Sequence, residues 1–236
     1  MSGLVDAATA ILGASEKRLE IAAHNVANIS TPGFKRQIGF SQLLRAAEGG
    51  DVSALPEVTV RRSFVQGKLS ETRNPLDLAI SGEGFFQLRA GERILYSRQG
   101  QFTLSADGNL VTPQGYILQQ QGGGDLVLDK GKVTIEQDGT LLDEGRPVAR
   151  IELFAPGDAN RLDPVGESCF SAGPAAMDPV RDPVIRQGMV EGSNVELGDE
   201  MVQMMTALRQ SEGGARLVQV YDDLIGRAIS SLGQAR

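Results

Sequence analysis

Apolar and small residues recur at spacings of three and four along the first 28 residues of the chain. Such spacing places them on one face of a helix, so the pattern predicts a helix from Ser2 to Asn28. The stripe consists of Leu4, Ala8, Ile11, Ser15, Leu19, Ala22 and Val26. Because it holds few large side chains, a lone helix would gain little from burial, and we expect it to pack against other helices. An ordinary surface helix of a globular domain is the alternative.

The helical pattern stops within the segment ANISTPGFK. Asn28 can take a left-handed or capping conformation, and Thr31 is pushed out of the helical region because it precedes Pro32. Gly33 supplies the conformational freedom for a turn. The sequence therefore predicts that the helix ends at one place and releases the next segment in one direction.

A second long amphipathic pattern occupies the C-terminal part of the chain. Its predicted stripe is Leu197, Met201, Met204, Leu208, Ser211, Ala215, Val218, Tyr221, Ile225, Ile229 and Leu232. Ser193 or Asn194 is a natural N-cap, and acidic residues such as Glu200 suit the positive end of a helix. Gly213 and Gly214 interrupt the pattern at a cost of about 1 kcal/mol each. They mark a weak point, a bend or very close packing.

Between the two helical patterns the chain alternates short apolar runs with turn sequences. Residues 35–75 show no single period and are interpreted as a connector with some strand. From Leu76 to about Ala155 the pattern is typical of an antiparallel β domain. Residues 156–183 should be mostly irregular, with a short extended piece around Cys169 and Phe170, and residues 184–189 should form an extended return path.

The predicted fold class is α+β, with N- and C-terminal helices that pair around a central, mostly antiparallel β domain. The helical domain comprises residues 1–34 and 194–236, the connectors comprise residues 35–75 and 184–193, and the β domain comprises residues 76–183.

Three motifs in this order resemble those of the bacterial flagellar rod and hook proteins. The first contains Asn28, Thr31, Pro32, Gly33, Phe34 and Lys35; the second contains Gly82, Gly84, Phe85 and Phe86; the third contains Glu191, Gly192, Ser193, Asn194 and Val195, followed by Glu200, Met201 and Val202. The length and the third motif favour the proximal-rod branch over the distal rod and the hook.

The resemblance implies a structural subunit that assembles helically and transmits torque from motor to hook. It implies that both termini form a coiled-coil domain, with the β domain outermost, and that no catalytic, cofactor or metal site is present. Expected partners are further copies of the chain, neighbouring rod subunits and the flagellar export apparatus. On the second helix, Met201, Met204, Leu208 and Ile225 are the residues expected to carry assembly contacts.

Composition narrows the alternatives. The chain has 23 basic and 30 acidic residues and a net charge of −7, which disfavours nucleic acid as a partner. Cys169 is the sole cysteine, so an intrachain disulfide is excluded, and the residue is interpreted as incidental in a loop. We expect no cleaved signal peptide and no membrane span, which is compatible with export through the flagellum into its periplasmic rod.

The sequence offers only weak candidates for catalytic or ligand-binding residues. His24 is the single histidine and is expected to be a polar residue near a helix end. The Gly82–Gly84 step is followed by a strand-like segment, which argues against a phosphate loop. Pairs such as Glu71 and Asp77 have no specificity as a catalytic dyad. A secreted β-domain enzyme or glycan-binding module remains the alternative, although the β segment has no Trp to line a sugar site.

Overall fold

A computed structural model describes most of the chain. The described residues are 3–43, 56–128, 133–157, 162–166, 168–173 and 177–233. They divide into two compact units. The helical unit comprises Met1–Ala27, Gln37–Ser63 and Glu196–Arg236, and the strand unit comprises Asn28–Arg36 and Phe64–Val195. Each unit is discontinuous in sequence, so both are built from segments that are far apart in the chain.

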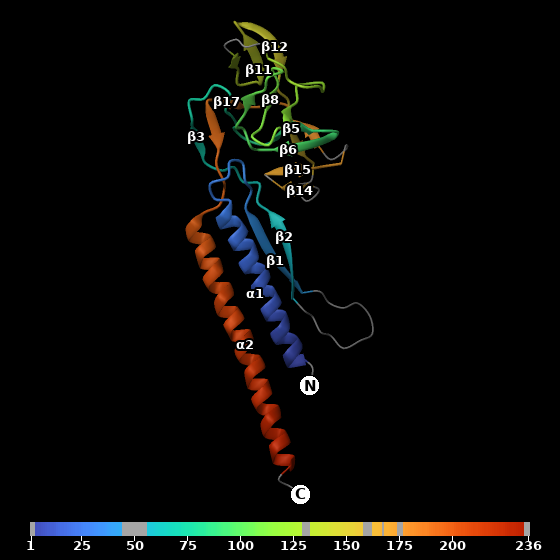
Figure 1. Ribbon diagram of the computed structural model, residues 1–236, viewed down its shortest axis with the longest axis vertical. Coiled ribbons are helices and arrows are strands. Elements are labelled where there is room, and N and C mark those ends of the chain that lie inside the picture. The colour runs from blue at the N-terminus through green and yellow to red at the C-terminus, as the bar shows by residue number, and fades with distance from the viewer. Residues whose placement is uncertain are drawn as a thin grey trace. The chain divides into compact units, whose positions relative to one another are not determined.

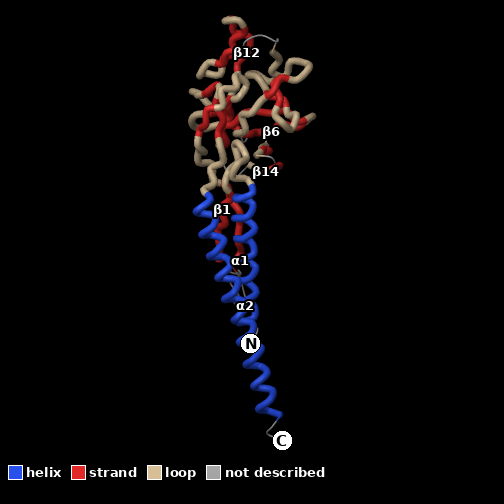
Figure 2. Tube along the Cα trace, turned by 60° about the vertical axis from the view of Figure 1, so that its left-hand side comes forward, coloured by secondary structure: helices blue, strands red, loops and turns tan. Residues whose placement is uncertain are grey.

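The helical unit contains two long helices that lie side by side (Figures 1 and 2). α1 spans Gly3–Ala27 and α2 spans Leu197–Gly233, which confirms a helix at each end of the chain. The helices are antiparallel, because the end of α1 meets the start of α2 through Asn25 and Glu200. α2 continues through Gly213 and Gly214 without interruption. Neither helix is long and apolar enough to cross a membrane.

An antiparallel hairpin lies beside α1 in the same unit (Figure 1). β1 spans Gln37–Leu43 and β2 spans Pro56–Arg62, and Gly39 pairs with Val60 in their ladder. A side chain on Gly39 would lie 3.1 Å from Cδ1 of Ile21, so the glycine allows the hairpin to approach the helix closely. Part of the segment predicted as a connector therefore packs with the helices.

The interface between the helices is made of small residues. On α1 the buried positions Ala8, Ser15 and Ala22 recur every seven residues, which confirms the phase predicted for this helix. On α2 the predicted stripe is only partly buried. Burial follows Glu200, Ala207 and Gly214, whereas Met201 and Leu208 are about half exposed, at 54% and 50%. The predicted stripe of α2 mixed residues of two different faces.

The strand unit consists of short antiparallel strands joined by turns (Figure 2). Its strands are β3 Leu69–Glu71, β4 Leu78–Ile80, β5 Phe85–Ala90, β6 Arg93–Ser97, β7 Thr103–Leu104, β8 Leu110–Val111, β9 Ile117–Leu118, β10 Val133–Ile135, β11 Thr140–Asp143, β12 Arg146–Arg150, β13 Leu153–Pro156, β14 Asp163–Gly166, β15 Cys169–Ser171, β16 Met177–Pro179, β17 Ile185–Gln187 and β18 Met189–Glu191. The largest sheet has the order β14-β15-β6-β5-β9-β8-β7, with β13 bridging β5 and β16. β10, β11 and β12 form a second sheet, and β17-β4 and β18-β3 form two-stranded ladders.

The main core of this unit contains Phe86, Leu88 and Phe102 among other buried apolar side chains. A second cluster joins Phe85 and Phe170 through an edge-to-face contact of their rings, whose centroids are 5.8 Å apart. Antiparallel pairing confirms the α+β class. The segment 156–183 holds more strand than predicted, since β14 and β16 accompany the expected piece at β15. Cys169 lies in that strand within the main core, so the prediction of a loop position was wrong.

Candidate assembly surface and motif junction

The first motif forms a closed turn directly after α1. The amide of Thr31 donates to the carbonyl of Asn28 at 3.1 Å, and the hydroxyl of Thr31 donates to the side-chain oxygen of Asn28 at 3.2 Å. The amide of Phe34 donates to the Thr31 carbonyl at 3.3 Å, and the Phe34 ring is buried. Pro32 stands inside this turn, where it needs no amide proton. These hydrogen bonds form the turn that ends α1 where the sequence predicted.

Gly33 is required both by conformation and by space. Its φ is +68°, in the region that favours glycine. A side chain there would collide with the backbone nitrogen of Gln99 and would lie 2.5 Å from the carbonyl carbon of Arg98. The amide of Gly33 donates to the carbonyl of Glu191 at 2.8 Å. The first motif is therefore fixed directly onto the start of the third motif.

The third motif uses its polar groups to hold neighbouring segments. The Asn194 side chain accepts from the amide of Arg36 at 2.6 Å and donates to the carbonyl of Val65 at 2.9 Å. The Gly192 amide donates to the carbonyl of Lys68 at 2.9 Å. Because α2 begins at Leu197, its N-cap position is Glu196, and the prediction of a cap at Ser193 or Asn194 was wrong. The Ser193 hydroxyl instead accepts from the amide of Val195, whose side chain is buried.

A buried ionic cluster joins these segments. Nζ of Lys35 lies 2.7 Å from Oε1 of Glu191, and Nη1 of Arg98 lies 3.1 Å from Oε2 of the same carboxylate. The Lys35 and Glu191 side chains are 0% exposed and that of Arg98 is 4% exposed. The Gly67 amide also donates to the Glu191 carboxylate, at 2.9 Å. We call Lys35, Arg98 and Glu191 the motif junction.

The electrostatics of the motif junction are those of charges removed from water. Burial lowers the pKa of Lys35 and the pKa of Arg98, and the neighbouring Glu191 carboxylate opposes this change in both. Because two cations share one carboxylate, each of them also needs a hydrogen-bond acceptor elsewhere. Lys35 donates to the Val65 carbonyl at 2.9 Å, and Arg98 donates to the Gly82 carbonyl at 2.8 Å. Such hydrogen bonds are what make a buried ion pair tolerable.

The second motif contributes to the motif junction through β5 and the turn that precedes it. Gly82 and Gly84 have φ values of +110° and +113°, which favour glycine. A side chain on Gly84 would also lie 3.0 Å from Cγ2 of Val180. The Phe85 ring lies below the guanidinium of Arg98, with 5.3 Å between Cζ and the ring centroid, whereas Phe86 enters the main core. All three motifs thus converge in the strand unit, around charges whose partners are other parts of the chain.

The helical unit has its own buried polar contact. The Asn25 amide nitrogen donates to the carbonyl of Gln37 at 2.9 Å and to Oε2 of Glu200 at 3.1 Å, and the Asn25 oxygen accepts from the amide of Gln37 at 2.8 Å. Asn25 is 0% exposed and Glu200 is 1% exposed. The prediction assigned Glu200 to the dipole of the first helical turn. Glu200 lies in the first turn of α2, as predicted, and its side chain is also buried at the helix interface.

A row of large apolar side chains stands on the face of α2 next to the one that packs on α1, about 100° away around the helix axis. Leu197, Met201, Met205 and Leu208 are 48–54% exposed, and we call them the outer face. Met204 is partly buried, whereas Ile225 is 38% exposed near the far end of α2. Val220 and Leu224 are exposed there as well, at 55% and 57%. Apolar side chains that gather on one surface mark an interaction site.

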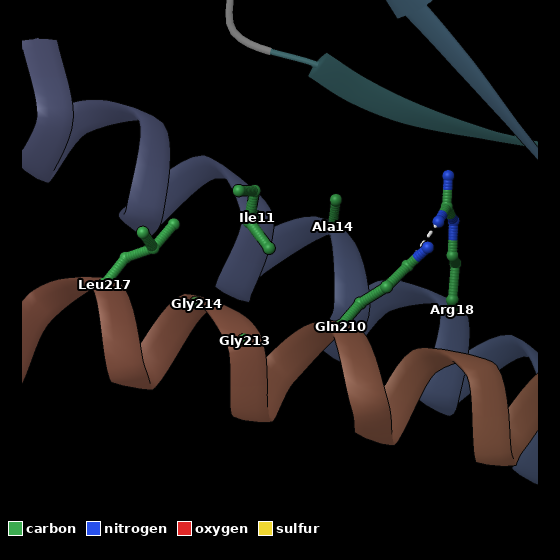
Figure 3. Close-up of a pocket in the computed structure, with 7 residues that line it drawn as sticks. All are labelled: Ile11, Ala14, Arg18, Gln210, Gly213, Gly214 and Leu217. Atoms are coloured by element: carbon green, nitrogen blue, oxygen red, sulfur yellow. Dashed lines mark hydrogen bonds between the residues drawn. The ribbon is translucent and has the colours of Figure 1, made fainter.

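A groove of about 500 Å³ runs between the two helices (Figure 3). Its lining residues are Ile11, Ala14, Arg18, Gln210, Gly213, Gly214 and Leu217. Arg18 donates to the Gln210 side chain at 2.6 Å at one end of the groove. Gly214 is buried against Leu12, whereas a methyl group added at Gly213 would meet no atom within 4 Å. The two glycines therefore have different surroundings although they are adjacent.

Sequence reasoning recognised the motifs but missed the residues that join them. Lys35 and Glu191 were visible as charges inside motifs, although nothing in the sequence indicated that they pair. Arg98 lies outside every motif and offered no signal. Asn25 precedes the first motif and lies outside the predicted stripe of α1, so no pattern in the sequence indicated its buried contact. His24 is exposed, in agreement with its interpretation as a surface residue.

The paired terminal helices, the buried motif junction and the exposed outer face are features typical of a structural subunit. Comparison with known proteins agrees. Residues 12–35 match the family described as flagella basal body rod protein, residues 79–142 match the flagellar hook protein FlgE/F/G D1 domain, and residues 186–231 match the flagellar basal body rod FlgEFG protein C-terminal family.

Individual relatives extend over nearly the whole chain. The basal-body rod protein FlgF of Caulobacter vibrioides is 33% identical over 92% of this chain and 93% of the relative. FlgG of Agrobacterium fabrum is 34% identical over 95% and 97%, and FlgF of Rhizobium meliloti is 31% identical over 94% and 95%. The chain belongs to the family of flagellar basal-body rod proteins, and it is a structural rod subunit of the FlgF and FlgG type.

Proposed function

We propose that this rod subunit occupies the FlgF-like, proximal position and polymerises helically to transmit torque toward the hook. The observation that carries the proposal is the outer face of α2. Four large side chains stay about half exposed there although the adjoining face of the same helix packs on α1. Complete burial of such a side chain from water is favourable by about 1.5–3 kcal/mol, and covering one that is already half buried would contribute roughly half of this. A neighbouring subunit that covers all four would therefore gain several kcal/mol, about 3–6 kcal/mol.

The helix pair provides the second support. Buried residues on α2 recur at Glu200, Ala207 and Gly214, and partly buried ones at Met204, Ser211 and Val218. This seven-residue repeat is the spacing of a coiled coil. We infer that the pair forms the coiled-coil domain of the subunit and that Met201, Leu208 and Ile225 contact neighbours. Contacts that differ on the two sides of a subunit produce an open helical filament instead of a closed dimer.

The motif junction has a mechanical role in this proposal. Its segments are tied by ionic and backbone bonds that are buried from water, so load on the chain is resisted by the strand unit as a whole. The partners are further copies of the chain and neighbouring rod subunits, reached after export through the flagellar apparatus. No catalytic group or cofactor takes part.

Localisation in purified basal bodies tests the position. A strain that lacks the native subunit is complemented with a tagged chain, and the tag is found by immunogold labelling. We expect labels in the rod on the motor side. Labels confined to the hook or the distal rod would contradict the proximal assignment, and absence from basal bodies would contradict the function itself.

A pair of substitutions tests the outer face. Leu208→Asp should stop rod assembly, because each copy would bury a charge at an apolar contact, which is costly unless the charge is paired. Gln203→Asp changes an exposed position on the same helix and should assemble normally. Hydrogen exchange should show an intact strand unit in both variants. Normal assembly of Leu208→Asp alongside failure of Gln203→Asp would mean that the wrong face has been chosen.

A further inference from the structure

Gly213 weakens α2, and no contact among the described residues explains why this position is glycine. After proline, glycine is the least favourable residue in the interior of a helix. The close approach of Leu12 explains Gly214, whereas a methyl group at Gly213 would meet no atom within 4 Å. Gly213 also lies in regular helix without a positive φ, so its backbone does not require glycine. The open space at this position therefore indicates a contact with something outside the chain.

The space at Gly213 belongs to the groove of about 500 Å³ between the two helices (Figure 3). Ile11 and Ala14 line the groove on α1, and Leu217 lines it on α2. Each of these side chains is apolar, and two of the four positions carry a methyl group or no side chain at all. A large apolar side chain from another molecule is therefore suited to enter the groove at this place.

The surroundings of the groove are basic. Arg18 stands at one end, where it donates to the side chain of Gln210 at 2.6 Å (Figure 3). Arg209 and Arg216 are four residues before and three residues after Gly213, so they lie on the same side of α2 as the glycine. Both arginines are exposed. The groove thus favours an occupant that carries an acidic group next to an apolar one.

α2 extends past the described part of α1 (Figures 1 and 2). Leu12 lies against Gly214, and Gly3, where α1 begins, is nine residues before Leu12. In the antiparallel pair Gly3 is therefore level with about residue 223 of α2. Residues 224–233 continue α2 beyond this level for about 15 Å, at 1.5 Å per residue. We call residues 224–233 the free end.

The free end has the chemistry that the groove favours. Ile225 follows Ser211 and Val218 at spacings of seven residues, so the face of α2 that packs on α1 continues into the free end. Ile225 is 38% exposed there. Asp222 precedes Ile225 by three residues and lies next to it on the helix surface. Asp223 precedes it by two residues and therefore faces another side.

We propose that the groove receives the free end of α2 from a second copy of the chain. The two α2 helices run in the same direction, because copies in an open helical assembly keep one polarity. With Ile225 of one copy on Gly213 of the other, Asp222 is level with Arg18 and Arg209. Ile225 and Gly213 are twelve residues apart, so the copies are displaced by about 18 Å along α2. The proposal rests on the proposed function, for which it supplies one contact between polymerising subunits.

Disulfide cross-linking of the purified full-length chain tests the docking. A tagged chain carries Ala14→Cys and an untagged chain carries Ile225→Cys, both in a Cys169→Ala background. A disulfide requires Cα atoms within about 7 Å, so a mixed dimer formed under mild oxidation reports that the free end occupies the groove. Glu16→Cys replaces Ala14→Cys in the control. Glu16 is exposed and lies about 200° away around α1, so its mixed dimer should form about tenfold more slowly.

Two pairs of substitutions test the contacts themselves. Gly213→Leu fills the groove and should lower the yield of mixed dimer about tenfold, equivalent to about 1.4 kcal/mol. Gly198→Leu makes the same change at an exposed glycine of α2 with no atom within 4 Å, and the yield should not fall. Asp222→Lys should lower the yield at about 0.15 M salt, which screens charges that are not in contact, whereas Asp223→Lys should not. Hydrogen exchange should show a folded α2 in all four variants.

Several results would overturn the proposal. One is equal cross-linking of the cysteines at positions 14 and 16, and another is a yield that Gly213→Leu leaves unchanged. Dimers joined only through two Ile225→Cys side chains would mean that free ends pair with each other. A disulfide from Ala14→Cys to a different rod subunit in isolated basal bodies would identify another occupant. A mixed dimer in solution, without immunogold label in basal bodies, would contradict the rod assignment alone, so the two failures are distinguishable.

Discussion

Gly213 and Gly214 are adjacent in α2 but have opposite surroundings, which allows a sharp test of the helix interface. A methyl group added at Gly214 would lie 3.1 Å from Cγ and 3.2 Å from Cδ2 of Leu12, and 3.3 Å from Cγ2 of Ile11. A methyl group added at Gly213 would meet no atom within 4 Å. Gly213→Ala and Gly214→Ala are therefore the same chemical change inside one helix, made once in the open and once against α1.

The expected magnitudes follow from two opposing effects. Alanine favours the interior of a helix over glycine by about 1 kcal/mol, and both variants gain this amount. Extra methyl groups in a well-packed interface cost about 1–3 kcal/mol, and only Gly214→Ala bears this cost. We expect Gly213→Ala to stabilise the helix pair by about 1 kcal/mol. Gly214→Ala should range from neutral to destabilising by about 2 kcal/mol, which is the difference of the two effects.

Amide hydrogen exchange is the suitable assay, because the chain has two units and a single unfolding transition is not assured. Protection factors along α2 give the free energy of local opening directly. Gly213→Ala should raise protection around residues 207–218, and Gly214→Ala should leave it unchanged or lower it. Equal increases in both variants would refute the reasoning, since they would mean that α1 yields to the added methyl group without cost.

Three further predictions concern other sites. Glu191→Ala leaves two buried cations without their carboxylate and should destabilise the strand unit by about 3–5 kcal/mol in urea denaturation. The control Glu71→Ala removes an exposed ion pair and should cost about 1 kcal/mol or less. Similar losses of stability in the two variants would contradict the role of the motif junction. Hydrogen bonds from Arg89, and then from Gln119, lower the pKa of Asp125. Its contribution to the free energy of unfolding is therefore present above the ordinary pKa near 3.9 and is lost as the pH falls through the lowered pKa. Asp125→Asn should reduce the loss of stability at acid pH, and an unchanged acid dependence of stability would exclude the contribution. His24→Gln should leave motility intact in a swarming assay, because the side chain is exposed; a non-motile strain with normal export would reopen a chemical role.

The two helices show how far hydrophobic spacing can be used. On α1 the predicted stripe contains the buried positions Ala8, Ser15 and Ala22, whereas Ile21 and Asn25 are buried outside it. On α2 apolar residues occupy two faces, and the spacing followed the larger ones. Spacing reports where apolar residues lie along a helix. It does not distinguish an apolar face that packs within the chain from one that remains exposed.

The ionic cluster could not be predicted for a different reason. Lys35, Arg98 and Glu191 are separated by 63 and 93 residues in sequence, and single charged residues have no periodicity. Their meeting depends on β6 and β18 ending at the same place in the strand unit. Only the fold brings the three charges together, and the sequence showed no more than that two of them belong to motifs.

Gly33 was predicted from local conformation, yet the reason it must be glycine is largely tertiary. A turn after Pro32 needs freedom of φ, and the observed +68° agrees with this. Asparagine can also adopt such a value, so conformation alone leaves a second residue open. The close approach of the Gln99 nitrogen removes that option, because any side chain would collide with backbone. The motifs of this chain therefore encode contacts between segments that are far apart in its sequence.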